Sequence, residues 1–96
     1  MNIMKNFASS EMLINNNHVR IIKWHFLPDE TTGKHEHEYD YVVLPTKTGE
    51  LTIIDDNGIT NFNLKLNEPY FRNKGIIHEI FYGGNDYMEF IEIEIK

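Results

Sequence analysis

The chain has 96 residues, 41% of them hydrophobic and 25% charged, which is the composition of one ordinary globular domain. It contains no cysteine, so disulfides and thiolate metal sites are excluded and any metal must be held by imidazole nitrogen or by oxygen. The formal net charge is −6 and runs of aliphatic residues do not exceed three, so we expect no nucleic acid partner, no membrane-spanning segment and a cytoplasmic location.

The N-terminal residues 1–17 are weakly patterned, and we expect an arm or an edge strand there, centred on residues 11–14. Residues 18–96 show β patterns throughout and form the predicted domain. Within this domain, residues 18–27 are rich in β-branched and aromatic types and end at Pro28, which indicates a turn.

Residues 35–44 show the clearest alternation in the chain. Successive side chains of a strand point to opposite faces, so one face is expected to carry His35, His37, Tyr39, Tyr41 and Val43. The other face is charged and is expected to be solvated, with Glu36, Glu38 and Asp40. Pro45 ends the predicted strand.

Four more strands are predicted, at 51–54, 59–66, 76–82 and 87–95. Asn57 and Gly58 lie between the first two, and both tolerate the positive φ of a primed hairpin turn. Glu89, Glu92 and Glu94 are interpreted as a solvated or edge-protecting series. Many short strands with frequent turns, and no helical period, indicate an all-β sandwich or barrel.

Three histidines are the candidate metal ligands. His35 and His37 occupy positions i and i+2 of a strand, so both imidazoles face the same way and can reach one ion. Two exposed histidines on a polar strand are the competing interpretation. His78 lies in a later β-patterned segment, from which a third ligand could come across a barrel. Alone, His78 would be interpreted as a structural histidine. It supports a metal site only in combination with His35 and His37.

These residues resemble the two sequence motifs of the cupin superfamily. The first motif is Gly, five residues, His-x-His, three or four residues, Glu, six residues, Gly. In this chain Asp29 stands at the opening glycine, His35 and His37 match, and Gly49 matches the closing glycine when the longer spacing is used.

The second cupin motif is Gly, five residues, Pro-x-Gly, two residues, His, three residues, Asn. Gly75 and His78 match it, whereas Asn67, Asn73 and Tyr82 replace its opening glycine, its proline and its asparagine. The resemblance extends over most of the chain after residue 18. It implies a cupin-type double-stranded β-helix, which is a jelly-roll barrel of antiparallel strands.

The resemblance also implies a mononuclear centre in which His35, His37 and His78 hold one divalent transition metal ion. Imidazole nitrogens with open positions suit Fe, Zn, Ni, Cu or Mn, and the ligand type does not choose among them. The glutamate of the first motif should fall at position 41 or 42, which are Tyr41 and Val42 here. The simplest interpretation is a three-histidine site, similar in ligand set to the iron centres of the thiol dioxygenases of this superfamily.

Four other residues are second candidates. Asp40 would need a local β-bulge to turn toward the histidines. Tyr41 and Arg72 are candidates for binding a substrate, and their alternatives are a packed aromatic side chain and a surface ion pair. His25 is a candidate fourth ligand or supporting partner, and its alternative is a structural histidine among apolar neighbours.

Three functions remain open from the sequence. The chain could be a small-molecule metalloenzyme, dioxygenase-like or isomerase-like. It could instead bind or sense a metal or a small molecule without turnover. It could also be a metal-free scaffold, for which the missing glutamate argues. Cupins of one domain usually pair through sheet edges or an exchanged N-terminal arm, so the resemblance implies a homodimer.

Overall fold

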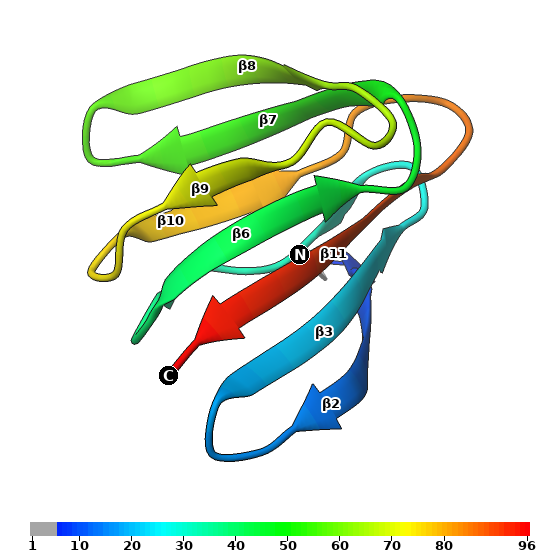
Figure 1. The fold of residues 1–96 in the computed structure, drawn as a ribbon. Coiled ribbons are helices and arrows are strands. Elements are labelled where there is room, and N and C mark those ends of the chain that lie inside the picture. The colour runs from blue at the N-terminus through cyan, green and yellow to red at the C-terminus, as the bar shows by residue number, and fades with distance from the viewer. Residues whose placement is uncertain (1–5) are drawn as a thin grey trace.

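A computed structural model describes residues 6–96, which form eleven strands and no helix (Figure 1). The strands are β1 (Asn6–Phe7), β2 (Ser9–Asn15), β3 (Val19–Phe26), β4 (Glu30–Thr31), β5 (His35–Glu36), β6 (Asp40–Pro45), β7 (Gly49–Asp55), β8 (Gly58–Leu64), β9 (Tyr70–Arg72), β10 (Ile77–Phe81) and β11 (Met88–Ile95). The predicted all-β fold is confirmed. Because residues 6–96 contain no helix, none of them forms a membrane-spanning helix.

The strands form two sheets that are the walls of a barrel (Figure 1). One sheet has the order β1-β4-β10-β7-β8, with β5 also paired to β10, and the other has the order β2-β3-β11-β6-β9. The pairings are antiparallel except that of β1 with β4. The N-terminal segment thus gives one strand to each sheet, while residues 1–5 of the predicted arm lie outside the described residues.

The core is built from the inward faces of both sheets. Alternate residues of β6 and β11 are buried, as a strand with one face toward a core requires. Phe26 and Met88 are fully buried, and they pack with Leu51, Leu64 and Phe90 in the same cluster. These apolar side chains fill one part of the barrel and leave the polar cluster described below in another.

The predicted continuous strand over residues 35–44 is wrong in one respect, because the structure divides it into β5 and β6. The chain passes here from one sheet to the other, since β5 pairs with β10 and β6 pairs with β11. His37 lies in the connection and still makes ladder-like contacts. Its N–H donates to Ile76 O at 2.9 Å, and its carbonyl accepts from Gly75 N at 2.7 Å. These bonds hold His37 facing the barrel interior outside a regular strand.

The hairpin predicted at Asn57 and Gly58 is confirmed, but its turn differs from the expected one. Asp55 pairs with Gly58, and only Gly58 has a positive φ, of 118°, whereas Asn57 does not. Asp55 Oδ1 accepts the Asn57 N–H at 2.8 Å, and this bond from side chain to backbone stabilises the turn. The Asn57-Gly58 pair therefore predicted the position of the turn correctly, but only Gly58 adopts the expected positive φ.

Two departures from the cupin motifs have a backbone explanation. Asp29 and Asn67, which replace the opening glycines of the two motifs, have φ values of 66° and 63°. Gly75, which matches the second motif, has a φ of 88°. Asp and Asn are the non-glycine residues that tolerate the left-handed region best. At Asp29 and Asn67 the residue type thus differs from the glycine of the motif, but the backbone has the positive φ that glycine favours.

The interpretation of the C-terminal glutamates as solvated or edge-protecting is wrong for two of the three. β11 lies between β3 and β6, inside its sheet. Glu92 and Glu94 share the inward face with Met88 and Phe90 and are only 6% and 4% exposed. Glu89 points to the outer face. The physical reason is strand parity, because the period of two continues through the acidic residues.

Candidate metal centre

The three candidate histidines meet inside the barrel. His35 and His78 are directly opposite each other on β5 and β10, and His37 follows from the connection. His37 Nε2 lies 3.0 Å from His35 Nε2 and 3.0 Å from His78 Nε2. One nitrogen of each ring lies within 4.8 Å of the others, so the three imidazoles share one small volume.

The outer nitrogens of two rings have partners that orient them. His35 Nδ1 lies 2.9 Å from the carbonyl oxygen of Gly33, which can only accept, so Nδ1 carries the hydrogen. His37 Nδ1 lies 3.3 Å from Glu92 Oε1. With hydrogen on the outer nitrogens, the Nε2 atoms present lone pairs to the centre of the cluster.

Burial keeps the inner histidines uncharged. Burial lowers the pKa of His37 to about 3, with the neighbouring imidazoles of His35 and His78 acting in the same direction. Burial likewise lowers the pKa of His78 to about 4, with further lowering by His35 and by the Arg72 guanidinium. Both rings are therefore neutral near pH 7, which is the form that binds metal ions.

The cluster fits one metal ion bound through the three Nε2 atoms. Converging lone pairs repel one another unless a cation or proton lies between them. With each metal–nitrogen bond at about 2.1 Å, nitrogens at right angles are separated by about 3.0 Å, and nitrogens in a tetrahedron by about 3.4 Å. The two spacings of 3.0 Å lie close to these values, so the three imidazoles would hold one ion together.

Glu92 is the functional side chain that sequence reasoning missed. Its Oε2 accepts a hydrogen bond from Trp24 Nε1 at 3.1 Å, while Oε1 faces His37. Burial raises the pKa of Glu92 to about 7, against the lowering effect of the Trp24 hydrogen bond. The signal was present in the sequence, because Glu92 continues the inward alternation of Met88 and Phe90.

Glu94 lies one inward position further along β11 and is paired. Arg20 Nη2 and Nε lie 2.6 Å and 2.8 Å from Glu94 Oε2. His37, Glu92 and Glu94 also bring ligand atoms within 4.8 Å of one another. The Arg20 guanidinium neutralises Glu94. We therefore interpret the group of His37, Glu92 and Glu94 as contacts that hold His37 in place, and not as a separate cation site.

Tyr41 packs directly on the cluster. Its ring is 2% exposed and stacks on that of His37, with 4.0 Å between centroids and 17° between planes. Burial raises the pKa of the Tyr41 hydroxyl well above its usual range, and nearby Glu92 adds to this, so it stays protonated and can donate a hydrogen bond. Tyr41 thus both supports His37 and faces the adjoining cavity.

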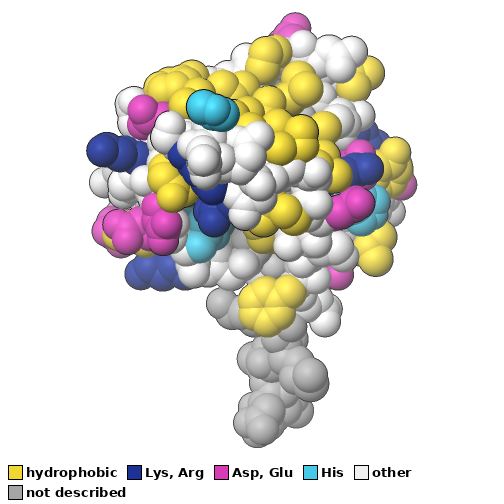
Figure 2. All heavy atoms as spheres, turned by 60° about the horizontal axis from the view of Figure 1, so that its bottom comes forward, with side chains coloured by type: hydrophobic (Ala, Val, Ile, Leu, Met, Phe, Trp, Pro, Cys, Tyr) yellow, Lys and Arg dark blue, Asp and Glu magenta, His cyan; other side chains and the backbone are white. Residues whose placement is uncertain are grey.

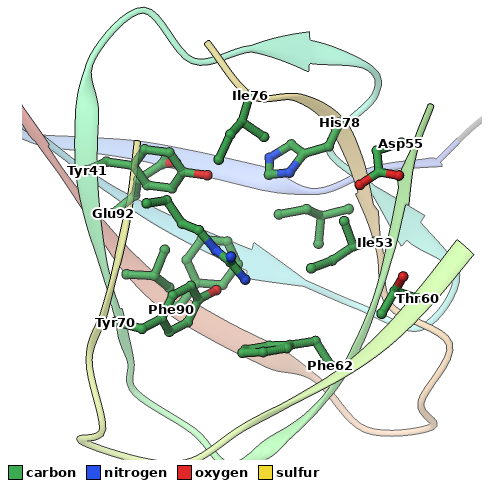
Figure 3. A pocket seen from close by; sticks show the side chains of 13 residues that line it. Tyr41, Ile53, Asp55, Thr60, Phe62, Tyr70, Ile76, His78, Phe90 and Glu92 are labelled. Atoms are coloured by element: carbon green, nitrogen blue, oxygen red, sulfur yellow. The ribbon is translucent and has the colours of Figure 1, made fainter. Parts of the chain in front are cut away.

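A cavity of about 290 Å³ adjoins the histidines (Figure 3). Most of its wall is apolar or aromatic, and the polar groups on it include Tyr41, His78, Arg72, Asp55 and Glu92. This volume is at the lower end of the usual range for ligand sites, which suits a small metabolite.

Arg72 is held on the cavity wall by aromatic rings. Its guanidinium carbon lies 5.2 Å from the Tyr70 centroid and 5.7 Å from the Phe62 centroid. Among the described residues no carboxylate forms an ion pair with it, so the surface ion pair considered from the sequence is not found there.

A second cavity, of about 200 Å³, reaches the cluster from another side. Its wall includes His35, His37, Glu92 and Glu94. The walls of the two cavities differ in character, since the first is mostly apolar and the second is mostly charged or polar. Glu92 lines both of them.

The remaining candidates lie apart from the cluster. His25 is on β3, where its Nδ1 contacts Glu89 Oε2 at 3.1 Å and its ring stacks on Tyr87 with centroids 5.3 Å apart. Asp40 Oδ1 accepts the Lys74 N–H at 2.8 Å. Neither side chain belongs to the groups of potential ligands found in residues 6–96. The structure thus brings together His35, His37 and His78, with Tyr41 and Arg72 beside them.

Comparison with known proteins agrees with this fold. The chain belongs to the cupin superfamily, and its described residues form one barrel. It is 34% identical over 83 residues to the β-alanine degradation protein BauB of Pseudomonas aeruginosa, a match that covers 86% of this chain and 87% of that protein. No family model matches the sequence.

Solved structures give the same result for the fold. A cupin-domain protein of Bordetella pertussis superposes with a TM-score of 0.95 at 33% identity, over 99% of both chains. A cupin superfamily protein of Desulfitobacterium hafniense superposes with a TM-score of 0.70 at 22% identity, over 99% of this chain and 83% of the other. The predicted cupin-type double-stranded β-helix is therefore confirmed.

Proposed function

We propose that this cupin binds one divalent transition metal ion through His35, His37 and His78 and a small carboxylate in the adjoining cavity. The observation that carries the proposal is the convergence of the three rings, in which His37 Nε2 lies 3.0 Å from the Nε2 atoms of His35 and His78. The ion, when bound, supplies Lewis acidity and open positions for a substrate oxygen or water. The protein's part is to hold the three imidazoles in place around the ion.

The carboxylate part of the proposal comes from Arg72. An arginine on a mostly apolar wall, with no carboxylate ion-pair partner in the described residues, favours an anion that can accept two parallel hydrogen bonds. The relative named for β-alanine degradation belongs to a chemistry of small carboxylates, which supports the same class of ligand. Tyr41 would donate its hydroxyl hydrogen to such a ligand.

Metal content is the direct test. The full chain is purified untagged and without chelator, reconstituted with Fe, Zn, Ni, Cu or Mn ions, and analysed for bound metal. We expect one ion per chain in the wild type and a loss in His35→Ala and His78→Ala. His25→Ala is the matched control, because His25 lies on the outer face and should leave the content unchanged. A wild type that takes up none of these ions would favour the metal-free scaffold.

Turnover separates an enzyme from a sensor. The loaded protein is incubated with small thiols, oxo acids and β-amino acids, and oxygen uptake and product formation are followed. Dioxygenase-like chemistry consumes oxygen, isomerase-like chemistry changes the substrate without it, and binding without turnover supports the sensing role.

We also propose that the protein is a cytoplasmic homodimer. The support is β2, an edge strand whose residues are all exposed, including Met12, Leu13 and Ile14. Figure 2 turns the side of the barrel that holds β2 forward and shows hydrophobic side chains at the surface among charged ones. An unpaired edge with apolar side chains favours pairing with a second chain.

A further inference from the structure

The cavity beside the histidines carries two opposite charges that are not paired. Arg72 comes from β9 and Asp55 from the end of β7, and both line the same space of about 290 Å³. In Figure 3, Asp55 lies next to His78 and across the cavity from Tyr41 and Tyr70. No ion pair joins Arg72 to Asp55 or to any other carboxylate of the described residues, so the two charges are more than 4 Å apart.

Both charged groups are held in position by local contacts. The Arg72 guanidinium lies over the rings of Tyr70 and Phe62. Asp55 Oδ1 accepts the Asn57 N–H at 2.8 Å, which leaves the other carboxylate oxygen free to accept from a ligand. None of these contacts pairs either group with an opposite charge, so each group can bind an ion of opposite sign without breaking an existing ion pair.

The other acidic group on the wall is already engaged. Glu92 accepts from Trp24 and faces His37, so its oxygens serve the histidine cluster. The cavity therefore offers one positive and one negative group, together with apolar surface from residues such as Ile53 and Ile76.

We propose that this cavity selects a short zwitterion, an amino acid whose carboxylate binds Arg72 and whose ammonium group binds Asp55 beside His78. This inference rests on the proposed function for its metal centre, which would lie near the amino end of the ligand. A dicarboxylate meets Asp55 with like charge, and a diamine meets Arg72 with like charge, so both are disfavoured. The volume of about 290 Å³ and the apolar part of the wall suit a ligand with a short chain of methylene groups.

The test measures equilibrium binding of four probes of similar length to the full chain by calorimetry or NMR titration. The probes are β-alanine, propionate, malonate and propylamine, each added to metal-loaded protein and to EDTA-treated protein. We expect β-alanine to bind at least about tenfold more tightly than the other three to the loaded protein. Equal affinities for β-alanine and propionate in both forms would overturn the proposal.

Four variants assign the charges. Arg72→Gln should weaken β-alanine and propionate binding about tenfold or more, and Asp55→Asn should weaken β-alanine about threefold while leaving propionate unchanged. Lys74→Gln and Asp56→Asn remove the same charges from exposed neighbouring positions and should change neither affinity. If the first two variants keep wild-type affinities, or if the controls lose them equally, the assignment of Arg72 and Asp55 is wrong.

The two proposals fail in different ways. Protein that binds no metal but still prefers β-alanine, with loss in Arg72→Gln, rejects the metal centre and supports the zwitterion site. Protein that binds one metal ion but shows no preference among the four probes supports the metal centre and rejects the zwitterion site. Melting curves of every variant identify one that has lost its fold, and the conservative Arg72→Lys variant, which keeps the charge, should recover part of the β-alanine affinity.

Discussion

Glu92 Oε1 lies 3.3 Å from His37 Nδ1, on the side of the ring opposite to the nitrogen that faces His35 and His78. For His37 to bind a metal through Nε2, its hydrogen must lie on Nδ1, and Glu92 must accept it. The chain lacks the glutamate of the first cupin motif. The Glu92 carboxylate, from β11, instead contacts His37 at Nδ1, on the side of the ring away from the other two histidines. This relationship makes Glu92 a positioning residue for the centre.

Glu92→Gln should therefore weaken metal binding about tenfold, because an amide is a weaker acceptor for the Nδ1 hydrogen than a carboxylate. The dissociation constant is measured by competition with a chelator of known affinity. Glu89→Gln is the control, since Glu89 is on the same strand but faces outward. Equal dissociation constants for wild type and Glu92→Gln would contradict the positioning role.

The metal-free protein should show a pH dependence of stability that depends on Glu92. The pKa of Glu92 is raised to about 7 in the folded state, so its folding contribution is lost as the pH rises from about 4.5 to 7. The pKa values of His37 and His78 are lowered to about 3 and 4, so stability from these residues is lost as the pH falls below about 6.5. The two effects oppose each other between pH 4.5 and 6.5.

In Glu92→Gln, the pH dependence of stability that comes from His37 and His78 should remain, and the dependence that comes from Glu92 should disappear. The free energy of unfolding of Glu92→Gln minus that of wild type should increase with pH, by about 1.4 kcal/mol per unit between pH 4.5 and 7. Urea unfolding of EDTA-treated protein, followed by far-ultraviolet circular dichroism, gives both values, and titrating groups shared by the two proteins cancel. A difference that is constant across this range would show that Glu92 is ionised at the same pH in both states.

Metal binding should stabilise the fold, because the three ligands come together only in the folded barrel. At a metal concentration of about 100 times the dissociation constant, linkage predicts about 2.7 kcal/mol of added stability, which is a rise in melting temperature of about 13 °C for a domain of this size. Calorimetric melts with and without EDTA measure this. His35→Ala should melt at one temperature in both conditions, and a metal-induced rise in that variant would place the binding elsewhere.

The sequence predicted which histidines lie together better than it predicted the strands that carry them. His35 and His37 were placed together by the period of a strand, although the structure puts His37 in a connection outside β5. His37 still faces the barrel interior beside His35, because its backbone hydrogen bonds to Gly75 and Ile76 hold it in that orientation. Sequence periodicity reports which way a side chain faces, and it does not report where a strand changes sheet.

Strand parity placed Glu92 and Glu94 on the inward face, but their residue type argued against burial. Glu92 and Glu94 are charged residues in a segment that reads as an edge strand, yet β11 lies inside its sheet. Strand order depends on contacts between residues far apart in sequence, such as Arg20 with Glu94 and Trp24 with Glu92. These partners make the burial of acidic groups possible, and they are invisible to a local pattern.

The opening glycine position of the first cupin motif is testable by substitution at Asp29. Its φ of 66° is tolerated by aspartate, is free of strain for glycine and is unfavourable for alanine. Asp29→Ala should lower the free energy of unfolding by about 1 kcal/mol, and Asp29→Gly should lie close to wild type because lower strain offsets higher chain entropy. Urea unfolding compares the three proteins, and equal loss in both variants would assign the effect to the side chain and not to φ.

The proposed homodimer predicts a specific effect at the β2 edge. Leu13 and Ile14 are 43% and 47% exposed on a strand that has a partner on one side only. If two chains pair there, Leu13→Lys places like charges opposite each other across the twofold axis and should convert the dimer to a monomer. Light scattering at micromolar concentration measures the mass. Ile59→Lys is the control, because Ile59 is 73% exposed on β8, at the far edge of the other sheet, and should leave the mass unchanged. A wild-type mass near 11.4 kDa would reject the dimer itself, and a dimer that survives Leu13→Lys would move its interface away from β2.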